Sequence, residues 1–72
     1  MTPPQVLDVA RQALAEGRGN PGNYQAWYVQ VDKWRVAPKW LVSQLTELPV
    51  SAFVTQETRR VLAQLGIEVT AV

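Results

Sequence analysis

The side chains that most often carry catalysis are missing from this sequence. It has neither histidine nor cysteine, so the usual proton shuttle and the usual thiolate nucleophile are absent. Its 6 carboxylates are scattered singly, without the Asp/Glu clustering that holds a hard cation. No serine or lysine stands beside a convincing general base. The residue types therefore predict a domain that is not an enzyme and takes no metal or other cofactor.

Cationic side chains next to aromatic ones offer a different chemistry. Arg35 and Lys39 lie on either side of a proline, with Trp40 beside them and Tyr28 on the preceding predicted strand. A cation next to an aromatic ring suits phosphate contact combined with base stacking. The alternative is that Tyr28 belongs to a covered face of the sheet and that Arg35 is a solvated strand residue.

A second polar group, TQETRR at 55–60, opens the last predicted helix. Its side chains have lengths that suit contacts in a nucleic-acid groove, and a helix N-terminus offers amides to a phosphate. With the preceding helix it suggests a helix-turn-helix-like unit, whose connector is longer than the usual turn. The alternative is a solvated helix face on which Glu57 and Arg60 form an ion pair. The candidate nucleic-acid contacts are Arg35, Lys39, Trp40, Thr55, Arg59 and Arg60.

The N-terminal residues have the pattern of a capped helix. Thr2 suits the N-cap, a proline follows it, and Gln5 suits the third position of a capping box. Apolar residues then recur every three or four positions up to Gly17, which suits a left-handed helix end. The pattern predicts a helix over 3–16, followed by a glycine- and asparagine-rich loop over 18–23.

The next segment predicts a β-hairpin. Residues 24–31 alternate between two faces, which is typical of a strand with one buried side. A two-residue turn at Asp32 and Lys33 keeps the apolar residues of both strands on one face. The pairs in this register are Val31 with Trp34, Gln30 with Arg35, and Val29 with Val36. Glycine takes a positive φ more cheaply than Lys33, so a longer or mildly strained turn is expected.

Two more helices and a short strand complete the predicted fold. One helix begins at Pro38, and the last is expected to be capped by Thr55 and ended by Gly66. Alternation over 67–71 predicts the final strand. The fold class is α+β in the order α-β-β-α-α-β, a hairpin plus C-terminal strand on three helices. The expected core residues share the apolar sides of their elements: Trp27, Val29, Leu41, Leu45, Phe53, Val61, Leu62 and Leu65.

Length and composition predict one soluble domain over 1–72. The chain has 72 residues, of which 47% are hydrophobic and 18% charged, a composition typical of folded domains. No apolar run approaches the roughly 20 residues needed to cross a bilayer, and the first residues lack a signal-peptide pattern. A cytoplasmic location without membrane contact is the expectation.

The charge distribution and the tryptophans indicate two possible partners. The net charge is only +1, but residues 18–46 hold four cations against a single acid. A weakly basic middle favours nucleic acid, with DNA first. The other expectation is a protein partner or a second copy of the chain, because Trp34 and Trp40 exceed what one small core readily encloses.

Residues 29–69 also resemble a small prokaryotic module that occurs alone or ahead of restriction-type (HNH or McrA-like) nuclease domains. The resemblance rests on the hairpin 29–36, Pro38-Lys39, Leu48-Pro49, Phe53 with Thr55, and the stretch from Arg59 to Ile67. It implies a shared fold, a DNA ligand, and contacts by Lys39, Arg59 and Arg60. The sequence departs from the module at Lys33, where glycine is more natural, and in its added first helix.

Overall fold

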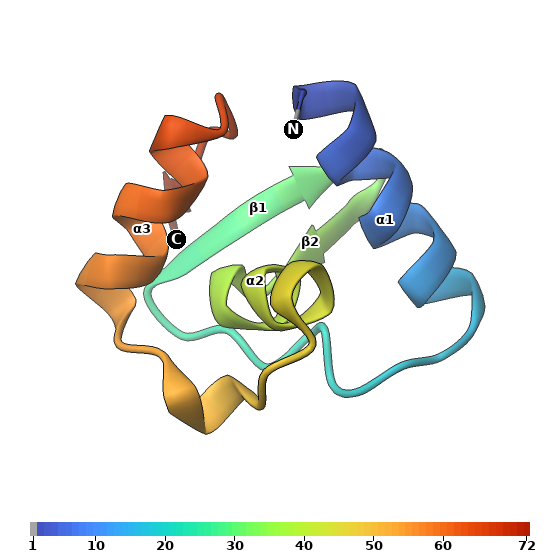
Figure 1. Cartoon of the computed structure of the whole chain (residues 1–72), viewed down its shortest axis with the longest axis horizontal. Coiled ribbons are helices and arrows are strands. Elements are labelled where there is room, and N and C mark those ends of the chain that lie inside the picture. Colours follow the sequence, from blue (N-terminus) through green and yellow to red (C-terminus); the bar gives the residue numbers. More distant parts are fainter. Residues whose placement is uncertain (1) are drawn as a thin grey trace.

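The computed structural model describes residues 2–72 and has the predicted α+β fold. Helix α2 crosses in front of the sheet, with α1 and α3 on either side of it (Figure 1). The sheet is antiparallel, and its strand order is β2-β1-β3. The elements are α1 (Pro3–Ala15), β1 (Trp27–Val31), β2 (Trp34–Val36), α2 (Pro38–Thr46), the 3₁₀ helix η1 (Val50–Ala52), α3 (Thr55–Gln64) and β3 (Thr70–Ala71). No helix within residues 2–72 has the length and apolar character that a membrane crossing requires.

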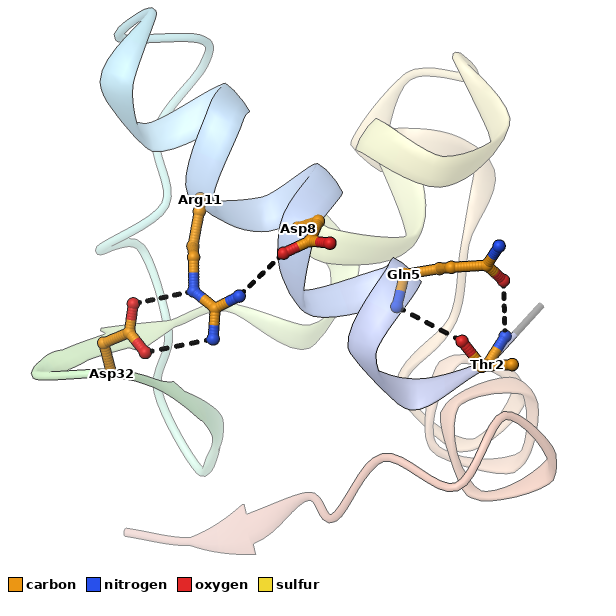
Figure 2. A network of polar contacts seen from close by, with 5 residues as sticks. All are labelled: Thr2, Gln5, Asp8, Arg11 and Asp32. Atoms are coloured by element: carbon orange, nitrogen blue, oxygen red, sulfur yellow. Dashed lines mark hydrogen bonds and ion pairs between the residues drawn. The ribbon is translucent and has the colours of Figure 1, made fainter.

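Helix α1 begins with the predicted capping box. The backbone N–H of Thr2 donates to Gln5 Oε1 at 2.8 Å, and the N–H of Gln5 donates to Thr2 Oγ1 at 3.4 Å (Figure 2). The two bonds satisfy donors that a helix start leaves without an intrahelical partner. Gly17, with φ of 67°, follows the helix and allows the chain to turn away.

The hairpin has the predicted two-residue turn and the predicted register, with Val29 opposite Val36. The expectation of a strained turn at Lys33 is wrong, because the positive φ of 54° falls on the preceding residue, Asp32. Aspartate tolerates this left-handed conformation better than most residues. The positive φ therefore needs no glycine at the second turn position.

An ion-pair network fastens this turn to α1. Arg11 donates from Nε to Asp32 Oδ2 at 2.8 Å and from Nη1 to Asp8 Oδ1 at 2.8 Å (Figure 2). The hydrogen bond from Arg11 lowers the pKa of the Asp32 carboxyl, and the same contact raises the pKa of Arg11. The network joins two elements that are distant in the sequence.

The third strand is shorter than predicted. Residues 67–71 alternate, but only Thr70–Ala71 pairs with β1. Ile67 instead closes the end of α3, where its N–H donates to the carbonyl of Leu62 at 2.9 Å and its side chain is buried. The first predicted strand residues, 24–26, also lie outside β1 because regular pairing begins at Trp27.

The core lies between the helices and one face of the sheet. Val29, Val31 and Val36 are buried on that face, while Gln30 and Arg35 on the other face are exposed. Three of the eight expected core residues are buried, namely Val29, Leu41 and Leu62. Four others are partly buried and pack against this core, namely Leu45, Phe53, Val61 and Leu65, and Trp27 is partly buried.

The expectation that Trp40 is an exposed contact residue is wrong. Its side chain is only 1% exposed, and its Nε1 donates to the carbonyl of Arg18 at 2.8 Å. The loop after α1 folds over the first turn of α2 and covers the indole. Trp40 is thus a structural residue of the core.

Thr55 is not the cap of α3. Val54 holds the N-cap position, and Thr55 is the first helical residue. The side chain of Val54 offers no acceptor for a capping hydrogen bond. The chain stays extended through Phe53 and Val54 after η1, and the helix begins at Thr55, one residue earlier than a Thr55 cap requires. Within α3 the buried threonine is Thr58, whose Oγ1 donates to the carbonyl of Val54 at 2.9 Å.

Candidate nucleic-acid interface

A groove of about 560 Å³ lies between the loop that precedes β1 and the first turns of α2 and α3. Its volume falls within the usual range of ligand pockets, about 300–1,000 Å³. Aromatic rings, small apolar side chains and side-chain amides form most of its wall. The lining residues are Asn20, Asn23, Tyr24, Gln25, Ala26, Trp27, Ala37, Pro38, Lys39, Trp40, Val50, Thr55 and Thr58.

The loop wall of the groove is fixed by bonds to α2 and to the residue before it. The N–H of Ala37 donates to the carbonyl of Pro21 at 2.7 Å, and the indole of Trp40 holds the carbonyl of Arg18. Gly19 has a φ of 62°, and a Cβ placed there would lie 3.2 Å from the Trp40 ring. Glycine therefore permits the loop to lie directly on the indole.

The electrostatic character of the groove is positive. Lys39 is the one charged residue of its lining, and no carboxylate lies among the lining residues. The first turns of both α2 and α3 contribute to the wall, and neither N-cap residue, Ala37 or Val54, provides a side-chain acceptor. The positive end of α2 therefore adds to the field of Lys39, whereas Glu57 in the first turn of α3 offsets the positive end of that helix.

Arg59 lies directly behind one wall of the groove. Its guanidinium carbon is 3.7 Å from the centroid of the Trp27 ring, a close cation–π contact. Trp27 lines the groove, whereas Arg59 is not among the lining residues. Arg59 and Arg60 both line a second hollow of about 540 Å³ between α3 and residues 67–69.

Arg35 lies on the other side of the sheet. Its guanidinium carbon is 4.7 Å from the ring centroid of Tyr28, the residue that follows Trp27 in β1. Consecutive strand residues point to opposite faces, so Arg35 and Arg59 are separated by the sheet. The expectation that Arg35, Lys39, Arg59 and Arg60 form one continuous face is therefore wrong for Arg35.

The cations differ in whether the domain itself neutralises them. Arg11 binds Asp8 and Asp32, and Arg18 binds Glu16. Among residues 2–72, the four predicted contact cations form no ion pair, and Arg60 does not pair with Glu57. A phosphate that approaches Lys39, Arg59 or Arg60 has no internal ion pair to break.

The structure thus brings together some of the predicted contacts. Lys39 and Thr55 line the groove, Arg59 stands behind its wall, and Arg60 lies one residue further along α3. The buried Trp40 also borders the groove, but the other aromatic residues and the amides of the wall are not among the predicted contacts. The sequence carries a signal for them, because residues 20–27 combine three amides with two aromatic residues, but the first part of this segment has the composition of a connecting loop.

Comparison with known proteins gives no match, neither to a protein-family model, nor to a curated protein, nor to a solved structure. The candidate site therefore rests on its own geometry and charge.

Proposed function

We propose that this chain is a non-enzymatic module that binds nucleic acid, with DNA as the first choice, at the groove between α2, α3 and the loop before β1. One observation carries the proposal. The groove combines aromatic rings with a cation, Lys39, has no carboxylate in its lining, and has Arg59 stacked behind its Trp27 wall.

The chemistry of nucleic acid matches each part of this surface. Phosphates meet Lys39, and further along the strand they meet Arg59 and Arg60, none of which the domain neutralises. Aromatic walls suit bases, because every base offers a π face. The resemblance of residues 29–69 to modules found ahead of nuclease domains supports DNA as the form of nucleic acid.

The first test is a fluorescence-anisotropy titration of labelled oligonucleotides, repeated between about 50 and 200 mM salt. Three phosphate contacts predict a slope of log K against log salt of about −2 to −3, given about −0.7 to −0.9 per contact. Lys39→Ala is expected to flatten the slope by somewhat less than one unit, because it removes one contact.

The matched control uses the two arginines that stack on neighbouring rings of β1. Arg59→Ala is expected to weaken binding, whereas Arg35→Ala, on the other side of the sheet, leaves it unchanged. Equal losses for the two variants would place the ligand elsewhere. Absence of binding at low salt would refute the function.

A protein partner is the second candidate, and one feature of the connector between α2 and α3 favours it. Leu48, Val50 and Val54 are 51%, 45% and 61% exposed, although all three are large apolar residues. Exposed apolar residues gathered in one segment often mark contact surfaces. Of the three tryptophans only Trp34 is exposed, so this candidate rests on the connector rather than on aromatics. Self-association in sedimentation equilibrium that persists in high salt and disappears in Val54→Asp would support it.

A further inference from the structure

We propose that the groove takes single-stranded rather than duplex nucleic acid, with one base stacked against the groove side of Trp27. The inference rests on the proposed function and makes it more specific. It follows from the shape of the cationic surface, from the aromatic wall and from the amides at the rim.

The arrangement of charge suits a flexible strand. The three cations on the groove side line two separate hollows, Lys39 in the groove and Arg59 and Arg60 in the second hollow. The backbone of a single strand is flexible enough to follow these hollows, whereas a duplex is stiff over this length. These cations do not form a protruding ridge on which a duplex could lie. The exposed face of α3 also presents Glu57, whose carboxylate would repel the phosphates of a duplex laid along that helix.

A concave aromatic site gives the second argument. In a duplex both faces of every base are stacked on neighbouring bases, so a ring inside a groove meets them only after a base has been extruded. Single strands offer unstacked bases at no such cost. Trp27 and Tyr24 both line the groove, and the ring centroid of Tyr24 lies 5.8 Å from that of Tyr28.

The stack on Trp27 already has one layer in place. The guanidinium carbon of Arg59 lies 3.7 Å from the ring centroid, and Arg59 is not part of the groove lining. A base on the groove side completes a sandwich of guanidinium, indole and base, in which the indole is held flat before the ligand arrives. Little side-chain freedom is then lost on binding.

The rim supplies hydrogen-bonding groups for a base edge. Asn20, Asn23 and Gln25 line the groove, and none of their side-chain amides bonds to another of the described residues 2–72. An amide both donates and accepts, which matches the Watson–Crick edge of a base. That edge is free only in a single strand.

The experiment compares the full chain binding a short oligothymidylate, the duplex that this strand forms with oligoadenylate, and poly-glutamate as an acidic peptide. The single strand is expected to bind at least about ten-fold more tightly than the duplex. Trp27→Leu is expected to weaken single-strand binding by about five-fold or more, because loss of one stacked base costs about 1–3 kcal/mol.

Fluorescence keeps the inference testable if Trp27→Leu fails to fold. Binding of the single strand quenches tryptophan emission in the unaltered chain and in Trp34→Phe, whose exposed ring lies outside the groove. Trp27→Phe retains an aromatic ring for folding and is expected to lose most of the quench.

The outcomes separate the inference from the function on which it rests. Duplex binding equal to or tighter than single-strand binding overturns the inference and leaves nucleic-acid binding in place. Single-strand binding with full quench in Trp27→Phe also overturns it. Tighter binding of poly-glutamate than of either nucleic acid, or binding of none of them, overturns the inference and the proposed function together.

Discussion

Replacing Trp40 by phenylalanine tests the most unexpected feature of the core. The indole is 1% exposed, and its Nε1 holds the carbonyl of Arg18 at 2.8 Å, which fastens the loop after α1 to α2. Phenylalanine keeps an aromatic ring at the site, but it has no N–H and occupies less volume. The change therefore removes one hydrogen bond and leaves a space beside the loop.

The expected cost has two parts. Loss of the hydrogen bond costs about 1 kcal/mol, because the carbonyl of Arg18 keeps no replacement donor. Truncation of the ring costs about 1–2 kcal/mol, less than the 3–5 kcal/mol of replacing a whole aromatic residue by alanine. The sum of about 2–3 kcal/mol is a large fraction of the total for a chain of 72 residues, about 4–11 kcal/mol at about 0.05–0.15 per residue.

Urea denaturation followed by far-UV circular dichroism measures this cost without relying on tryptophan emission, and thermal denaturation followed by the same signal gives the melting temperature. The melting temperature is expected to fall by about 10–20 °C, since 1 kcal/mol shifts a domain of this size by about 4–8 °C. The matched control is Trp34→Phe, whose ring is 54% exposed and should change stability by less than about 0.5 kcal/mol. Equal effects of the two substitutions would refute the assignment of Trp40 to the core.

Three further predictions concern the turn, the helix starts and the loop. Because the pKa of Asp32 is lowered in the fold, its stabilising contribution is present at neutral pH and lost as the pH falls below about 4. Asp32→Asn should therefore be less stable at pH 7 and lose less stability on acidification, as measured by urea denaturation across that range. Thr2→Ala should cost about 1 kcal/mol and Thr55→Ala less than about 0.5 kcal/mol, since only Thr2 accepts a capping bond; equal thermal shifts would contradict the assigned caps. Gly19→Ala should destabilise more than Gly17→Ala in the same assay, because both have positive φ but only Gly19 lies against the buried indole.

Local patterns in the sequence determined most of the secondary structure. The capping box at Thr2, the apolar alternation of the hairpin and the prolines at helix starts each act over a few neighbouring residues. Such interactions are readable without knowledge of the rest of the chain, so the α+β class, the register and the element order were predictable. The charge pattern also indicated Arg35, Lys39, Arg59 and Arg60 as one cationic face, which is wrong for Arg35.

Only the tertiary structure decided which of the candidate residues share a surface. Trp40 is buried because a loop about twenty residues earlier folds over it, a contact that no local period contains. Arg35 and Arg59 stack on adjacent residues of β1, and the alternation of the strand sends them to opposite sides once α3 is packed on one face. The groove itself joins three segments that are distant in the sequence. Long-range packing thus brings the residues of the candidate groove together, whereas short-range patterns determine the helices and strands that form its walls.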